Sequence, residues 1–121
     1  MSGRVKAPAR YVAQVERCLD QAAGRLGLKV PAKLVVRLLT VRHTSIVRGQ
    51  YCAKIPRTGV VARGWCQSAA GIITIVEEPG GKLPDMTIRW ECGRVLLWHA
   101  GVRDPAEQER RMNEENFRSW K

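Results

Sequence analysis

The 121-residue sequence lacks several signatures that define well-known functional classes. Its four cysteines, at positions 18, 52, 66 and 92, form no C-x-x-C pair, which argues against a zinc knuckle or a thioredoxin-type redox site. It has no glycine-rich phosphate loop of Walker or Rossmann type, and no serine or cysteine in a nucleophile–histidine–acid context. No stretch approaches the roughly 20 apolar residues of a membrane span. The function must therefore be sought in the residues that are present.

The basic N-terminus is followed by no apolar run, so we expect no secretory signal. The expected setting is the reducing cytoplasm, or the interior of a virion, where thiols stay free. The sequence alone leaves open a disulfide between Cys52 and Cys66. With 45% apolar and 26% charged residues, residues 1–121 are expected to form a single domain, with Met1 to Pro8 as a loose basic arm.

Positive charge is concentrated in the first half of the chain. Residues 1–64 hold 13 lysines and arginines against two acids, a balance of +11, and residues 65–121 hold 8 against 9, a balance of −1. This asymmetry suits an anionic partner, either an acidic protein or nucleic acid. No RNP, helix-turn-helix, KH or zinc-finger signature is present, so a solvated basic face is an equal interpretation. The candidate anion-binding residues, which lie among Tyr51 and Trp65, are Arg37, Arg42, Arg48, Lys54, Arg57 and Arg63.

Hydrophobic periodicity predicts two helices and several strands. Apolar residues recur at helical spacing from Ala9 to Leu26, and Gly27 is a suitable C-terminal stop. Residues 86–100, MTIRWECGRVLLWHA, predict a central helix. Its expected apolar face consists of Ile88, Cys92, Val95, Leu96 and His99. Strands are expected over 34–41, around Gly49 within 43–52, over 60–66 and over 70–77, with a turn at 56–59.

A third helix is predicted from Asp104 to Trp120. Asp104 suits the N-cap and Pro105 the first helical position, with Glu107 as the reciprocal capping residue. Two i,i+4 ion pairs are expected, Glu107–Arg111 and Glu114–Arg118. A thin apolar edge is expected from Met112, Phe117 and Trp120. The predicted fold is therefore α+β: an N-terminal helix, a small three- to four-stranded sheet, a central helix and a C-terminal helix.

The central helix contains Trp90-Glu91-Cys92-Gly93-Arg94, followed by an apolar run. This resembles the zinc helix of the zincin metallopeptidases, His-Glu-x-Gly-His and then an apolar run, with both histidines replaced. Trp90 stands at the first ligand position and Arg94 at the second, while Glu91 keeps the general-base position. The order of elements also resembles the minimal zincin architecture of a backing helix, a mixed sheet, an edge strand, the zinc helix and a C-terminal helix.

The two replacements argue against zinc. An indole only donates hydrogen bonds, and a guanidinium is permanently cationic and repels a dication. We therefore expect no metal and no cofactor, with Glu91 vestigial. Arg94 can take the place of the metal by pairing with Glu91 or with an acid of the last helix, such as Glu107 or Glu109.

A relocated metal site is the alternative arrangement of this region. Cys92 and His99 lie seven residues apart on one helix face, and Glu91 or the C-terminal acids can complete a ligand set. The simpler interpretation makes Cys92 a small buried residue and places His99 at a helix C-terminus, where a cationic ring is favoured.

We therefore expect a catalytically inactive zincin-like domain that acts as a binding or structural component, of a kind plausible in a bacteriophage or mobile element. In zincins the strand before the zinc helix edges the cleft, so the strand Ile72 to Val76 is a candidate for peptide binding by strand addition, or else a buried core strand. The alternatives are a basic nucleic-acid-binding protein, and an active metallopeptidase with non-standard ligands.

Overall fold

The computed structural model describes residues 4–119 and has an α+β fold, as predicted. A four-stranded sheet has the order β1 (Val5–Lys6), β2 (Val36–Arg42), β7 (Ile72–Glu77) and β6 (Gly64–Gln67). A second sheet contains β3 (Ser45–Val47), β4 (Gln50–Lys54) and β5 (Val61–Ala62). The helices are α1 (Val12–Leu26), α2 (Asp85–His99) and α3 (Pro105–Glu114). Within residues 4–119, no helix is long and apolar enough to cross a membrane.

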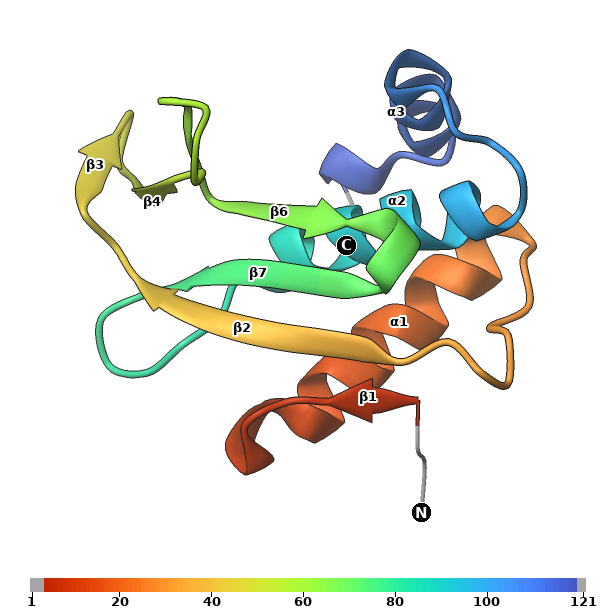
Figure 1. Ribbon diagram of the computed structural model, residues 1–121, viewed down its shortest axis with the longest axis horizontal. Coiled ribbons are helices and arrows are strands. Elements are labelled where there is room, and N and C mark those ends of the chain that lie inside the picture. The colour runs from red at the N-terminus through yellow and green to blue at the C-terminus, as the bar shows by residue number, and fades with distance from the viewer. Residues whose placement is uncertain (1–3, 120–121) are drawn as a thin grey trace.

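The four-stranded sheet is mixed, and its single antiparallel strand lies at an edge. Strands β1, β2 and β7 are parallel, and β6 runs antiparallel to β7. Helices α1 and α2 lie against one face of this sheet, and α3 packs on the far side of α2 (Figure 1). Alternate residues of the inner strands, including Val36, Leu38, Ile73 and Ile75, point into one core shared with the helices.

Helix α1 holds the start of α2 in place. The predicted end of α1 is confirmed, because Gly27 is left-handed with φ 68° and its N–H caps the last turn. Tyr11, in the 3-10 turn just before α1, donates its hydroxyl hydrogen to the Glu77 carboxylate at the end of β7. Asp85, in the first turn of α2, accepts from Gln14 at 2.6 Å and from Arg17 at 3.1 Å. The first turn of the central helix is therefore fixed to α1 by charge and hydrogen bonds.

Helix α2 is buried far beyond the single apolar face that its sequence indicates. Its predicted apolar residues are buried except His99, which is exposed. Arg89, Glu91 and Gly93 are buried as well, because α1, the sheet and α3 surround the helix. A Cβ atom at Gly93 would lie 2.6 Å from the sulfur of Met112. The absence of a side chain at Gly93 therefore allows Met112 and the C-terminal segment to pack closely against α2.

Helix α3 is shorter than predicted and has different ion pairs. The N-cap is confirmed, since Asp104 accepts from the N–H of Glu107 at 3.3 Å. The helix ends at Glu114, and a left-handed Asn116, with φ 59°, turns the chain into a 3-10 segment over Phe117–Ser119. The predicted pairs Glu107–Arg111 and Glu114–Arg118 are wrong, because one central arginine reaches both acids. The observed pairs are Arg110–Glu107, Arg110–Glu114 and Arg118–Glu109.

The apolar edge of this segment is a core contact rather than a thin surface stripe. Met112 and Phe117 are completely buried against α2. Trp120 lies outside the described residues. The abrupt turn at Asn116 is what brings Phe117 back onto α2, and a continuous helix cannot do this.

The prediction of a loose arm at Met1 to Pro8 is wrong for its described part. Val5 and Lys6 form β1, which adds to β2 in parallel register with Val36 and Arg37. The side chain of Val5 is buried, and the Arg4 guanidinium pairs with Asp20 of α1 at 2.6 Å. Two residues are too few to show a strand periodicity in sequence, so this pairing had no local signal.

The predicted strand at 60–66 is divided between the two sheets. Its first part is β5 and its second part is β6. The three short strands of the second sheet and their turns, residues 45–62, project beyond the end of the main sheet, where Figure 1 labels β3 and β4; we call them the β-arm. Both of its turns hold an arginine with positive φ, Arg48 at 51° and Arg57 at 67°.

Two glycines allow a matched test of the close packing at α2. Replacing Gly93 with alanine is expected to lower the free energy of unfolding by about 1–2 kcal/mol, because overpacking against Met112 and Phe117 outweighs the gain in helix propensity. At Gly24, in α1, an added Cβ atom would have nothing within 4 Å. Gly24→Ala is therefore expected to raise stability by about 0.5–1 kcal/mol. Urea unfolding of both variants measures these changes, and the opposite sign in either variant contradicts this account of the packing.

Candidate functional site

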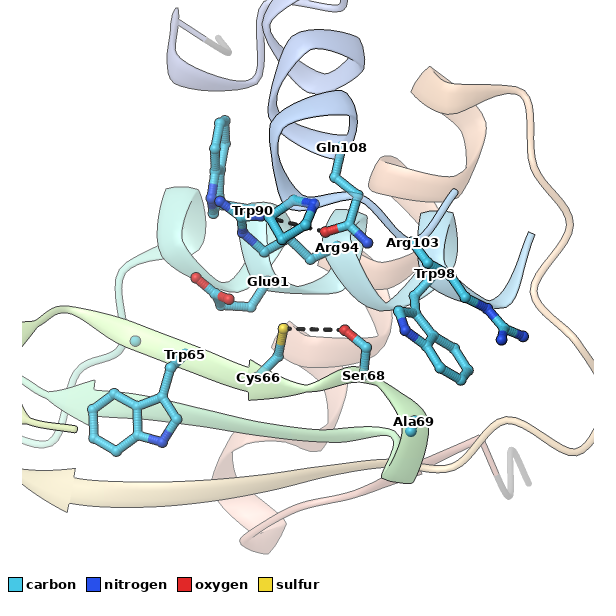
Figure 2. A pocket seen from close by; sticks show the side chains of 12 residues that line it. Trp65, Cys66, Ser68, Ala69, Trp90, Glu91, Arg94, Trp98, Arg103 and Gln108 are labelled. Atoms are coloured by element: carbon cyan, nitrogen blue, oxygen red, sulfur yellow. Dashed lines mark hydrogen bonds between the residues drawn. The ribbon is translucent and has the colours of Figure 1, made fainter. Parts of the chain in front are cut away.

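A cleft of about 590 Å³ lies between the edge strand β6 and helix α2. Strand β6 contributes Gly64, Trp65 and Cys66, and the short turn after it contributes Ser68 and Ala69. The opposite wall consists of Trp90, Glu91, Arg94 and Trp98 of α2, closed by Arg103, Pro105 and Gln108 from the next segment. All three motif positions singled out in the sequence therefore line one cleft (Figure 2).

Arg94 connects α2 to α3. Its Nη1 donates to Oε1 of Gln108 at 3.3 Å, and the amide nitrogen of Gln108 donates to the carbonyl of Val102 at 2.8 Å. Gln108 is only 4% exposed. The predicted link from Arg94 to the last helix is therefore present, but the partner is an amide. The acids proposed for it, Glu107 and Glu109, pair with Arg110 and Arg118 instead.

Trp90 carries two guanidinium groups on its ring. The Arg118 carbon Cζ lies 4.5 Å from the ring centroid and that of Arg94 lies 5.6 Å away. The ring of Phe117 meets it edge-on at 6.5 Å. Position 90 is thus filled by an aromatic side chain that holds arginines by cation–π attraction.

Glu91 is buried in the cleft, 6% exposed, and faces Cys66 across it (Figure 2). Burial raises the pKa of the Glu91 carboxyl, while the charge of Arg94 and a hydrogen bond with the Cys66 thiol act to lower it. The Cys66 thiol also bonds to the Ser68 hydroxyl at 3.4 Å. Burial and the neighbouring Glu91 raise the pKa of Cys66 to about 11, so this thiol is protonated at neutral pH and is a poor nucleophile.

Within the described residues, the donors around Glu91 do not fit zinc. Trp90 offers no acceptor and Arg94 brings a positive charge. The relocated set is not assembled either: Cys92 is completely buried, and His99 is exposed and bonds to the Ser68 carbonyl at 3.0 Å. Across residues 4–119, no three His, Cys, Asp or Glu side chains gather as a metal site requires. Cys52 and Cys66 are free thiols.

Two further hollows lie next in line, each sharing residues with its neighbour. A space of about 400 Å³ shares Gly64, Trp90 and Glu91 with the cleft and reaches Gln50, Arg63 and Arg118. A space of about 310 Å³ shares Gln50 and Arg63 with that one and extends along the β-arm to Arg48. We call these three hollows, which share lining residues, the groove. It runs along β6 and onto the β-arm.

Strand β6 presents an unpaired edge to the groove. It is the last strand of its sheet within the described residues. The N–H of Val76 donates to the Arg63 carbonyl at 3.0 Å, and alternate residues of an antiparallel pair bond to the neighbouring strand. In the observed register Trp65 therefore bonds to β7, whereas the backbone groups of Gly64 and Cys66 point to the open side.

The edge role predicted for Ile72 to Val76 is wrong. This segment is β7, an inner strand between β2 and β6, and Ile73 to Val76 are all buried. The alternative interpretation, a buried core strand, is confirmed. The open edge belongs to β6, which precedes β7 in the chain.

The candidate anion-binding residues do not form one patch. Arg48 and Arg63 line the groove, and Lys54 and Arg57 lie on the β-arm. Arg37 projects from the sheet on β2, and Arg42 lines a separate hollow beside His43 and Glu77. Of these six, Arg63 alone shares a hollow with the motif residues Trp90 and Glu91.

Sequence reasoning missed several residues of this site. Gln108, Arg103 and Arg118 carry no motif of their own, and they reach the cleft only because α3 folds back over α2. The sequence indicates Cys66 as a candidate disulfide residue rather than as the partner of Glu91. The alternation of β6 places Cys66 toward α2 and Trp65 toward the other face (Figure 2), which becomes visible once the strand bounds are known.

Comparison of the chain with protein-family models, curated proteins and solved structures gives no match. The site must therefore be interpreted from its own chemistry.

The raised pKa of Glu91 gives a pH test. The folded protein holds a proton on this carboxyl at pH values where the unfolded chain has released it, so ionisation of Glu91 destabilises the fold as the pH rises through the ordinary carboxyl range. Glu91→Gln removes this titration. We expect the variant to gain stability relative to the parent protein as the pH rises from about 4 to about 7, as measured by urea unfolding at a series of pH values. A stability difference that does not change with pH contradicts the burial of a charged carboxylate.

Proposed function

We propose that this chain is a catalytically inactive, metal-free domain with a zincin-like layout, which binds an extended polypeptide by strand addition to β6. The observation that carries the proposal is the open antiparallel edge of β6 facing the motif helix across a cleft. Its setting in a bacteriophage or mobile element stays a prediction.

The order of elements supports the zincin-like part of the proposal. A backing helix, a mixed sheet with an edge strand beside the cleft, the motif helix and a C-terminal helix follow one another as in the minimal zincin architecture. Trp90 and Arg94 lie one turn apart on the cleft side of α2, and Glu91 stands between them in sequence.

The chemistry of the cleft supports binding rather than hydrolysis. The residues at the ligand positions reject a dication, and the only carboxyl group among the described residues that line the cleft is buried against a protonated thiol. The backbone groups of Gly64 and Cys66 still offer hydrogen bonds to an incoming chain. A peptide can therefore be held without a group to activate water against it.

Restoring the ligands tests the zincin-like layout. Gln108 contacts Arg94, so position 108 faces position 94 from α3. A variant with Trp90→His, Arg94→His and Gln108→Glu is expected to bind Co²⁺ at one ion per chain, seen in its visible absorption. The matched control keeps Arg94 and carries only the other two changes; it is expected to bind about tenfold more weakly or worse. A folded triple variant that binds Co²⁺ no better than this control contradicts the layout.

Backbone methylation tests strand addition. A strand added to one edge uses only every second N–H of the peptide. We would measure fluorescence anisotropy with labelled decamers of repeating Thr-Glu, Thr-Gln and Thr-Lys. For whichever decamer binds, methylating every amide nitrogen is expected to weaken binding about tenfold or more, since all edge donors are lost. Two further peptides are methylated at every second nitrogen, one on the odd and one on the even residues. One of the two should bind within about threefold of the unmethylated decamer, because its methyl groups point away from β6. Failure of all three decamers to bind, or full tolerance of complete methylation, contradicts the proposal.

Nucleic-acid binding is the second candidate function. The sequence contains no acid between Asp20 and Glu77, and the β-arm in the middle of this stretch is basic at both of its turns. Its support is the positive field alone, because the described structure contains no element that resembles a known nucleic-acid-binding motif.

A further inference from the structure

We infer that the groove selects an acidic extended segment, with carboxylate side chains at alternating positions facing α2. This inference rests on the proposed strand addition to β6 and specifies its partner. It is carried by the charge of the groove and by the way its arginines are held.

The groove is lined by five arginines and one carboxyl group. The arginines are Arg48, Arg63, Arg94, Arg103 and Arg118, and the carboxyl group is Glu91. Glu91 is buried at the base of the cleft, while Arg118 alone among the five is ion-paired within residues 4–119, with Glu109 at 3.1 Å. A ligand in the groove therefore meets an excess of positive charge.

Three of the five arginines lie over tryptophan rings at cation–π distance. The Arg103 carbon Cζ lies 4.1 Å from the ring centroid of Trp98, in the cleft. Arg94 and Arg118 both contact the ring of Trp90. Contact of this kind restrains each guanidinium group. Arg94 is held further by its bond to Gln108, and Arg118 by its pair with Glu109. A guanidinium group pairs well with the two oxygens of a carboxylate, and a cation that is already restrained loses less freedom when a ligand binds.

The geometry of an added strand places alternate side chains on the arginine side. In β6 itself, Cys66 faces Glu91 and α2, and Trp65 faces the other way (Figure 2). A strand paired with β6 shares this alternation, with residues two apart projecting toward α2 about 7 Å from one another. Acidic residues at every second position therefore meet the row of arginines.

The same contacts favour a polypeptide over a single-stranded nucleic acid. Nucleic acid strands need open aromatic faces on which bases stack, and the rings of Trp90 and Trp98 already carry arginines. A nucleic acid backbone also offers no N–H and C=O pattern for Gly64 and Cys66. The two partner classes are separated in the test below.

The labelled Thr-Glu, Thr-Gln and Thr-Lys decamers test the charge preference. We expect Thr-Glu to bind about tenfold more tightly than Thr-Gln, and Thr-Lys to bind more weakly than both. A decamer with the same glutamates grouped in one half keeps the net charge but loses the alternation; it should bind about threefold more weakly than the alternating one. Equal binding of Thr-Glu and Thr-Gln overturns the acidic preference and leaves strand addition standing. Failure of every decamer is the failure of strand addition itself.

Arginine variants locate the effect in the groove. Arg103→Gln and Arg63→Gln, at opposite parts of the groove, are each expected to weaken Thr-Glu binding about three- to fivefold and to leave Thr-Gln binding unchanged. Arg37→Gln removes the same charge from β2, outside the groove, and should change Thr-Glu binding less than about twofold. Equal losses in all three variants overturn the inference, because they indicate attraction to net charge only.

A ten-nucleotide oligothymidylate, labelled in the same way, completes the test. We expect it to bind more weakly than the Thr-Glu decamer at about 0.15 M salt. Tighter binding of the oligonucleotide, with displacement of the decamer, overturns the inference in favour of a nucleic acid partner.

Discussion

Helix α2 is packed against α1, the sheet and the C-terminal segment, and much of the structure is arranged around it. Its apolar residues face α1 and the sheet, while Gly93 admits Met112 and Phe117 from the opposite direction. A buried helix has few places for polar side chains, so those of the motif must emerge at one opening. That opening is the cleft beside β6, where Glu91, Trp90 and Arg94 meet the edge strand. The same packing explains why α3 must stop early and turn back: only a sharp bend at Asn116 brings Phe117 onto α2.

Arg94 shows how a packed interior accommodates a cation between two helices. Arg94 links α2 to α3 by a hydrogen bond to a buried amide. A neutral partner has a physical advantage here, since Gln108 can accept from Arg94 and at the same time donate to the Val102 carbonyl. A carboxylate only accepts, and would leave that carbonyl without its donor. The sequence suggested an ion pair because charged residues can be recognised in a sequence. The need at position 108 for a side chain that both accepts and donates a hydrogen bond depends on the fold.

Much of the fold followed from the sequence because its main signals are local. The spacing of apolar residues placed α1 and α2, Gly27 and Asp104 marked helix ends, and the β-branched runs placed β2 and β7. The parts that failed depend on long-range pairing. Strand β1 forms only because β2 offers an edge, and the assignment of the open edge to β6 rather than β7 depends on strand order. At the site, the motif positions were located by pattern, whereas Arg103 and Arg118 enter it through tertiary packing alone.

An unpaired strand edge is normally a hazard, because two copies of a protein can join through it and continue into aggregates. Here the edge of β6 lies at the base of a groove with five arginines along it. If two copies paired edge to edge, their guanidinium groups would be brought together in a confined space. Like charges that are close together repel strongly when water is excluded. We therefore expect the positive lining to disfavour pairing of two copies through β6. Salt screens the repulsion between the two sets of arginines, so this protection is weakest at high salt concentration.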